Sequence, residues 1–530
     1  MKKFLIIILS FFSYLYSNSL KDEIKLINSS NKTILQEYYK FNNYNYYWIS
    51  KESKIKPIAY SLINSIEKDI LLKPYKNRIF NMNKIYSILK TQQFTQIEIE
   101  LTLLFEKYAS FLNKSIININ RFDSLIKKQN QKITWQKYPL KNSKVKLLNY
   151  LSKTNSFERF KEIYKLTFPN SMQLVYELKK LEEMKEKGIK FLKLDSSTIL
   201  KLNHNNQAVE NLRIRLYQEG FKNSLDTNNL RVFDKKLENI IKKFQKRYGL
   251  KVDGEVGKNT YRYLNLSLED KIEKIRLNIQ RLKWLPKTLG DEFFIVNIPE
   301  FKLKLYENKN LKLSMSVVVG EKNFPTSIFS NRISNIVLNP YWRIPKSIVK
   351  KDILPKLEKD KKYLEKMGIN LHENWEEDSF TYDSKYIDWS YYLNNNMDLP
   401  FRFIQQPNEK NPLGKIKFSF PNAHAIYLHD TPKKNFFNYN KRAFSHGCIR
   451  VEKPIVLLKN IYEIENNKEE IKSALKTIQS KNKQKITLKN SIPIHIVYLT
   501  AWIDEKGNLQ IRDDIYGLDN IQKKAIDYSL

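Results

Sequence analysis

The hydrophobic residues of this chain change their spacing once, and the change divides the sequence into two kinds of structure. Before residue 290 they recur at helical spacing, as at Ile97, Leu101 and Leu104, which indicates a helix with one buried face. After that point they alternate with polar residues, as in Phe301 to Tyr306, which is typical of a half-buried strand. We therefore predict a multidomain α+β protein whose helices come first and whose strands come later.

Composition shifts and turn signals divide the chain further. Residues 20–200 are expected to form a helical scaffold domain, because no group of chemically reactive residues gathers there. Residues 206–265 are expected to form a small three-helix domain, in which Asp234 is placed to cap a helix. Residues 290–518 are expected to form a β-rich domain, with strands that include residues 416–420 and 425–429. Within it, residues 346–413 are rich in charged and aromatic residues, but their hydrophobic residues show no clear periodicity. We therefore interpret this segment as a capping insertion.

The N-terminus has the features of an export signal. A basic start at Met1 to Lys3 precedes an apolar stretch from Phe4 to Leu15, and Ser17-Asn18-Ser19 offers a small-residue cleavage site. We predict a signal peptide over residues 1–19 and a periplasmic protein, which would be anchored in the inner membrane if the signal stayed uncleaved. The apolar stretch is shorter than the ~20 residues that span a bilayer.

The charge of the chain is strongly positive, with 93 Lys and Arg against 56 Asp and Glu and a formal net charge of +37. Such a charge raises the question of nucleic-acid binding. The lysines, however, are spread along the whole sequence, and neither an arginine-rich tail nor zinc-finger spacing is present. We therefore interpret the charge as a compositional bias and expect no nucleic-acid partner.

Cys448 is the only cysteine of the chain, so an intramolecular disulfide and a metal cage made of cysteines alone are excluded. Three of the six histidines, His424, His429 and His446, lie within 25 residues of it. Acyl transfer needs a thiolate, a base and donors for the oxyanion. His429 ends a predicted strand just before the breaker at Pro432, a position from which a base can face a nucleophile on a nearby turn.

The residues around Cys448 favour the same chemistry. Gly447 has no Cβ, so a substrate carbonyl can approach the backbone, and the N–H groups of Gly447 and Cys448 can form an oxyanion hole. If this segment is extended, His446 and Arg450 lie on the same face as Cys448. A nearby cation would then lower the pKa of the thiol.

Two other interpretations remain open from the residues alone. Lone buried cysteines are usually inert, so Cys448 could serve structure only. A zinc site built from His424, His429, His446 and Cys448 has suitable ligand types, although the spacing fits no common zinc pattern.

The segment Ser445-His446-Gly447-Cys448-Ile449-Arg450 resembles the S-H-G-C-[IV]-R signature of YkuD-type L,D-transpeptidases, and His429 lies at a separation similar to that of the family histidine. Further motifs resemble the long, YcbB-like members: Val296 to Pro299, Asn339 to Pro345, Phe420 to Asn422, Tyr427 to Pro432 and Tyr498 to Trp502. Residues 206–265 resemble a peptidoglycan-binding domain through Phe244 to Leu250 and through Asp253, Gly254 and Gly257.

This resemblance implies a set of residue roles. Cys448 would be the nucleophile and His429 the general base, and the backbone carbonyl of Asp430 would accept the imidazole N–H. The remaining catalytic positions that it implies are Gly447, His446 and Arg450. Substrate contacts are implied for Tyr427, Trp342, Ser445 and Asn422.

The resemblance also implies a reaction on peptidoglycan. Cys448 would attack the position-3 carbonyl of a tetrapeptide stem and release D-Ala, and an amine of a second stem would resolve the thioester into a 3-3 cross-link. Carboxypeptidase activity, D-amino-acid exchange and an inactive wall-binding protein remain alternatives. We expect no cofactor and no metal. Peptidoglycan is the expected partner of a monomeric chain, together with other enzymes of cell-wall synthesis.

Overall fold

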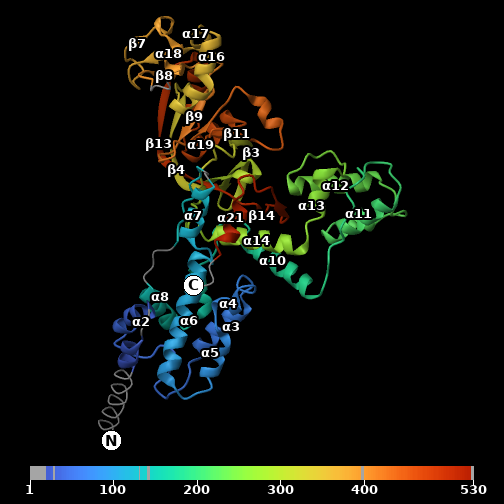
Figure 1. Ribbon diagram of the computed structural model, residues 1–530, viewed down its shortest axis with the longest axis vertical. Coiled ribbons are helices and arrows are strands. Elements are labelled where there is room, and N and C mark those ends of the chain that lie inside the picture. The colour runs from blue at the N-terminus through green and yellow to red at the C-terminus, as the bar shows by residue number, and fades with distance from the viewer. Residues whose placement is uncertain (1–19, 28–29, 130–131, 140–143, 395–398, 527–530) are drawn as a thin grey trace.

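The computed structural model describes residues 20–27, 30–129, 132–139, 144–394 and 399–526 (Figure 1). The signal peptide predicted over residues 1–19 lies outside the described residues. Within the described ranges, no helix combines the length and the apolar character that crossing a membrane requires.

The N-terminal region is helical, as predicted. Its central helix is α6 (Phe94–Lys114), which buries Ile97, Leu101 and Leu104 on one face. Shorter helices surround it (Figure 1). They are α2 (Ser30–Phe41), α3 (Pro57–Lys68), α4 (Lys76–Ile79), α5 (Met82–Ile88), α8 (Lys144–Thr154) and α9 (Phe157–Glu162). The next helix after α6, α7 (Ile119–Lys128), lies farther up in Figure 1 and packs against α21 (Leu518–Lys524).

The helical region shares its hydrophobic core with the β-rich domain. Residues from Leu20 to Tyr164 belong to the same apolar cluster as the inner side chains of the sheet. Aromatic rings link the two parts: Trp135 contacts Trp284 with ring centroids 5.1 Å apart, and Tyr498 with centroids 6.2 Å apart. Since apolar burial is the main force of folding, the helical region and the β-rich domain stabilise each other.

The predicted three-helix domain is present. It consists of α11 (Gln207–Gln218), α12 (Lys235–Tyr248) and α13 (Lys258–Leu264). The Asp234 carboxylate caps α12 by accepting the Leu237 N–H at 2.7 Å. Its apolar residues belong to a second core that also includes α10 (Ser171–Glu186) and α14 (Leu268–Leu282). Within this core, α10 packs mainly against α14.

The β-rich domain is built on one nine-stranded sheet with the order β11-β3-β12-β10-β9-β4-β13-β1-β2. The sheet closes on itself because β2 also pairs with β3. Three strands come early in this region: β1 (Glu292–Asn297), β2 (Lys302–Glu307) and β3 (Asn310–Gly320). The others are β4 (Phe329–Leu338), β9 (Ile416–Ser419), β10 (Leu428–His429), β11 (Ala443–Ser445), β12 (Ile449–Val451) and β13 (Gln484–Val497).

One predicted strand is shorter than expected. The sequence predicted a strand over 425–429, but β10 contains only Leu428 and His429. Ala425 has φ +52°, a left-handed conformation that cannot continue a strand. After the sheet, the chain forms α19 (Pro454–Ile464), α20 (Glu470–Ser480), β14 (Ala501–Ile503), β15 (Leu509–Ile511) and α21 (Leu518–Lys524).

The insertion predicted at residues 346–413 forms a small unit with its own apolar core. It lies at the end of the molecule farthest from the N-terminal helices (Figure 1). Its sheet contains β5 (Trp342–Arg343), β6 (Ile369–His372), β7 (Thr381–Tyr382) and β8 (Arg402–Gln405). Its helices are α15 (Lys346–Ile348), α16 (Leu354–Lys359), α17 (Tyr363–Met367) and α18 (Trp389–Asn394).

Gly320, at the end of β3, allows a close backbone contact, and we predict that Gly320→Ala destabilises the protein. A Cβ at this position would lie 2.2 Å from the Phe324 carbonyl oxygen and 2.6 Å from the Thr326 nitrogen. Overpacking of this kind costs about 1–3 kcal/mol, so the midpoint of thermal unfolding should fall. Gly257→Ala is the matched control, because its Cβ would meet open space at φ −99°. Equal midpoints for the two variants would contradict the prediction.

Candidate active site

Three neighbouring strands carry the residues around Cys448. In the register of the sheet, His429 on β10 pairs with Lys417 on β9 and with Arg450 on β12. The residues one step away, Phe418, Leu428 and Ile449, are buried in the core. Because side chains alternate between the faces of a sheet, Lys417, His429 and Arg450 form a row on the opposite face.

His429 is held as a neutral imidazole in one tautomer. Its ring is buried, and Nδ1 lies 2.6 Å from the Asp430 carbonyl oxygen. A carbonyl oxygen only accepts, so Nδ1 carries the proton and Nε2 is left as an acceptor. Burial, followed by the Arg450 and Lys417 charges, lowers the pKa of His429 to about 3. The residue is therefore uncharged at neutral pH.

Cys448 and Tyr427 lie next to each other, because each comes directly before one of the paired strands β12 and β10. The Ile449 N–H donates to the Tyr427 carbonyl at this point. Its thiol lies 3.5 Å from the Ala425 carbonyl oxygen. Burial raises the pKa of Cys448, while hydrogen bonding from Tyr427 and the charges of Lys417 and Arg450 act in the opposite direction. The low thiol pKa expected from a nearby cation is thus wrong for the free protein, because burial outweighs the cations.

The turn before Cys448 is fixed by hydroxyl groups. Ser445 Oγ accepts the Gly447 N–H at 3.2 Å and donates to the Cys448 carbonyl at 2.5 Å. Thr326 Oγ1 donates to the Gly447 carbonyl at 2.7 Å. Gly447 adopts φ +108°, which side chains with a Cβ rarely allow. Because its N–H is already used, the expected oxyanion hole reduces to the Cys448 N–H, for which no hydrogen bond is found among the described residues.

One residue of the signature, His446, lies differently from the expectation, whereas Asp430 contacts His429 as expected. The positive φ of Gly447 interrupts the extended segment, so His446 does not share the face of Cys448. His446 is exposed and contacts Phe324 with ring centroids 4.5 Å apart. The Asp430 carboxylate does not take part in the imidazole contact: it accepts the Lys415 N–H at 2.9 Å and pairs with Lys434 at 2.6 Å. Asp430 therefore reaches His429 through its carbonyl only.

The implied substrate contacts divide into three groups. Tyr427 and Ser445 lie at the thiol and its turn, as described above. Asn422 uses its whole amide to close a loop, donating to the Phe420 and Ile426 carbonyls and accepting the N–H groups of His424 and Ile426. Trp342 lies on β5 of the insertion and packs against the core there.

Lys417 is the residue that the sequence reasoning missed. Its ammonium lies 4.1 Å from the centroid of the Tyr427 ring, and it acts on the pKa of both His429 and Cys448. A lysine between two apolar residues of a predicted strand was the available signal. Arg450 adds a second charge, and its buried Nε has no hydrogen-bond partner in the described part of the chain.

The described ranges contain no group of three or more His, Cys, Asp or Glu placed to hold a metal ion. Of the four residues considered for zinc, His424 contacts Phe329 with ring centroids 5.4 Å apart, while His446 contacts Phe324. The two histidines thus pack against different phenylalanine rings.

We predict that Lys417→Met raises the pKa of Cys448. A cation stabilises the thiolate, so its removal should shift the pH dependence of thiol alkylation to higher pH and slow alkylation at neutral pH. One pKa unit corresponds to a tenfold change in thiolate fraction, so the rate of alkylation at neutral pH reports the direction of the change. Lys415→Met is the matched control, since Lys415 is exposed and pairs with Glu409. An unchanged alkylation profile in Lys417→Met would show that this charge does not act on the sulfur.

Comparison with known proteins agrees with this geometry. Residues 291–473 match the family profile of the YkuD L,D-transpeptidase catalytic domain, and residues 205–264 match that of the "Putative peptidoglycan binding domain". A Haemophilus influenzae protein named "Putative L,D-transpeptidase" is 35% identical over 251 residues, which are 47% of this chain and 48% of that protein. The chain thus spans about half the length of the curated relative that it matches.

Solved structures of L,D-transpeptidases align only weakly with the whole chain. An L,D-transpeptidase in complex with imipenem has a TM-score of 0.19 at 12% identity, over 40% of this chain and 60% of that one. An L,D-transpeptidase from Mycobacterium smegmatis has a TM-score of 0.18 at 10% identity, with the same coverage. Scores this low carry no argument, so the assignment rests on the sequence matches. On these, residues 291–473 belong to the YkuD family of L,D-transpeptidase catalytic domains, and residues 205–264 to a family of peptidoglycan-binding domains.

Proposed function

We propose that this protein is a peptidoglycan L,D-transpeptidase in which Cys448 is the nucleophile and His429 the general base. The observation that carries the proposal is that His429 ends β10 while Cys448 immediately precedes β12, the parallel strand paired with β10. The Asp430 carbonyl accepts from Nδ1 and fixes the tautomer in which Nε2 is the acceptor nitrogen. The family assignment of residues 291–473 supports the same reaction class.

The first step follows from the charges at the site. As the sulfur attacks the position-3 carbonyl of a tetrapeptide stem, His429 Nε2 takes the thiol proton. Lys417 and Arg450 stabilise the negative charge that develops on sulfur, and the Cys448 N–H is available to the oxyanion. The same cations disfavour an imidazolium, as the low pKa of His429 indicates. The proton therefore passes readily to the leaving nitrogen, which departs as the amine of D-Ala.

The second step resolves the thioester. The side-chain amine of a second stem attacks the acyl carbon, His429 accepts its proton, and the thiol is restored, which gives a 3-3 cross-link. Water in place of the amine would make the enzyme an L,D-carboxypeptidase, and a free D-amino acid would give exchange. All three outcomes use the same groups of this chain, so the acceptor decides among them.

The setting of the reaction is also part of the proposal. We infer from the sequence of residues 1–19 that the chain is exported and works in the periplasm. It acts as a monomer, beside other enzymes of wall synthesis. Lys351 of the insertion lies over the Phe324 ring at 5.0 Å, and Phe324 contacts His446. This contact supports the insertion as a cap next to the reactive turn.

The test is mass analysis of disaccharide-tetrapeptides incubated with the purified protein. We predict cross-linked dimer and free D-Ala for the native chain, and no product for Cys448→Ala, because the thiol carries the covalent step. His429→Ala should lower the rate by about 10²–10⁴-fold, the usual contribution of a general base. Ser480→Ala, at an exposed helix end, is a control that should keep full activity. Turnover by Cys448→Ala would refute the proposal, and a loss below tenfold in His429→Ala would assign the base elsewhere.

A carbapenem should acylate Cys448, because the thiol faces a site suited to an acyl donor and a strained β-lactam carbonyl can take the donor's place. Intact-mass measurement should show one adduct on each chain. Cys448→Ala should show none, whereas Lys415→Met should react like the native chain. An adduct that persists in Cys448→Ala would place the reactive group at another residue.

A further inference from the structure

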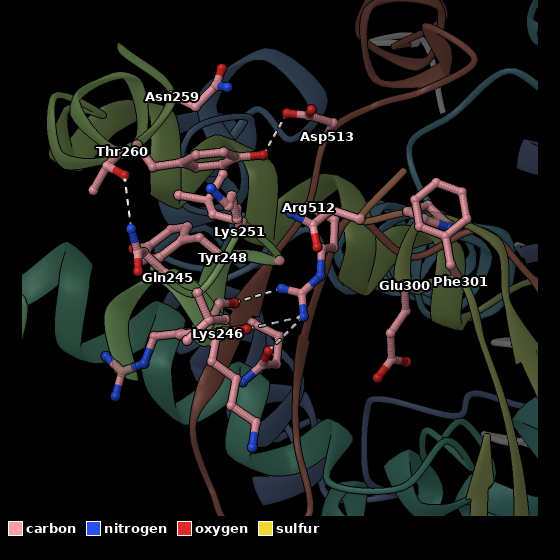
Figure 2. A pocket seen from close by; sticks show the side chains of 18 of the residues that line it. Gln245, Lys246, Tyr248, Lys251, Asn259, Thr260, Glu300, Phe301, Arg512 and Asp513 are labelled. Atoms are coloured by element: carbon pink, nitrogen blue, oxygen red, sulfur yellow. Dashed lines mark hydrogen bonds between the residues drawn. The ribbon is translucent and has the colours of Figure 1, made fainter. Parts of the chain in front are cut away.

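A large groove lies between the peptidoglycan-binding domain and the catalytic domain, away from the thiol. Its volume is about 1170 Å³, above the roughly 300–1,000 Å³ of ordinary small-molecule pockets. One wall is formed by the end of α12 and the start of α13, and the other by residues 299–304 with residues 504–513. Figure 2 shows the two walls facing each other, with Lys246 and Lys251 on one and Glu300 and Phe301 on the other. The size suits a segment of a polymer.

The floor of the groove joins the two domains firmly. The Arg512 guanidinium donates to the Arg247 carbonyl at the last turn of α12 (Figure 2), where a cation is favourable. Gly249 leaves room for it, since a Cβ there would lie 2.4 Å from Arg512 Nε. Asp513 binds Arg262 at 2.8 Å and Lys441 at 3.0 Å. The groove is therefore already formed in the free protein.

The lining carries more positive than negative charge, with twelve Lys or Arg side chains against six Asp or Glu. Several of the carboxylates are already neutralised: Asp513 as described, and Glu300 and Glu505 by Lys304. Five lysines of the lining form no ion pair among the described residues. They are Lys243, Lys246, Lys258, Lys302 and Lys506. Positive potential in a groove attracts and concentrates anions.

Lys302 shows this excess most clearly. It projects from β2 and is half-buried. Its pKa is lowered chiefly by burial, and the charges of Lys304, Arg512 and Lys246 lower it further, against a single raising charge from Glu300. A bound anion would relieve this repulsion.

The lining is not uniformly charged, which narrows the class of anion. Ile199 and Val252 belong to its lining and are 58% and 51% exposed, and the carboxylates of Asp504 and Glu255 also line it. A polymer with a phosphate on every unit would meet these carboxylates, whereas a chain with spaced carboxylates and apolar groups between them would avoid them. Peptide stems of peptidoglycan have this character.

We propose that the groove binds a carboxylate-bearing peptide stem of a peptidoglycan strand, next to the stem that reacts at Cys448. The proposal rests on the proposed function. The path between the two sites is short along the chain: Lys441 and Arg442 line the groove and lead directly into β11, whose Ser445 holds the reactive turn. The binding site is thus shared by two domains, and the three-helix domain alone supplies only one of its walls.

The experiment compares binding and turnover in the full-length protein. The groove variant replaces Lys246, Lys258 and Lys302 by Gln, and the rescue variant replaces the same three by Arg. The matched control replaces Lys128, Lys185 and Lys187 by Gln, three exposed lysines of α7 and of the end of α10. Binding is measured by co-sedimentation with purified sacculi, and turnover with soluble disaccharide-tetrapeptide.

We expect the groove variant to bind sacculi at least tenfold more weakly while its turnover of the soluble substrate stays within twofold, which also shows that it is folded. The rescue and control variants should bind like the native chain. Sacculi whose carboxylates are capped as neutral amides should bind the native chain as weakly as native sacculi bind the groove variant.

Native binding by the groove variant would overturn the proposal. Unchanged binding of the capped sacculi, or tighter binding of a polyphosphate than of sacculi, would overturn the ligand class. If the native chain binds sacculi through the groove but transforms no tetrapeptide, the proposed function is refuted, whereas the proposed binding site in the groove is supported.

Discussion

Two cations next to one buried imidazole set the chemistry of this protein. Lys417 and Arg450 pair with His429 from the strands on either side of it, and no carboxylate shares the row. Burying like charges near a neutral base is costly, and the sheet imposes the arrangement through its register. The same charges that make an imidazolium unfavourable make a thiolate more favourable. The imidazole is neutral at rest, and in the proposed reaction the same two cations would stabilise the negative charge that develops on sulfur.

The residues near Cys448 could be found from the sequence because their geometry is local. Ser445, Gly447 and Cys448 lie on one turn, and the two hydrogen bonds of Ser445 Oγ within it join residues at most three positions apart. His429 could be placed because it ends a strand before a breaker. Lys417 could not, because its place beside His429 depends on the pairing of β9 with β10. The direction of the thiol pKa was missed for a related reason, since burial depends on the whole fold.

The fold shows the same division between local and distant determinants. The three-helix domain, its helix cap at Asp234 and the insertion after β5 as a separate unit were predictable, because each has a turn or a change of hydrophobic period at its borders. The strands β4 and β13 were not predicted, since polar residues interrupt both of them. The core shared by the helical region and the sheet could not be predicted from the hydrophobic spacing either, because Trp135, Trp284 and Tyr498 come together only in the folded chain.

The position of β13 has a consequence for how this chain can be divided. The strand comprises Gln484–Val497 and lies between β4 and β1 in the sheet, yet it follows the last residue of the matched catalytic family, 473. A fragment cut at the family boundary would lose a central strand and expose two long unpaired edges. Such edges pair with other chains. The segment that matches the family profile is thus shorter than the segment needed to complete the sheet. The additional strand is β13, which follows the matched segment in the sequence.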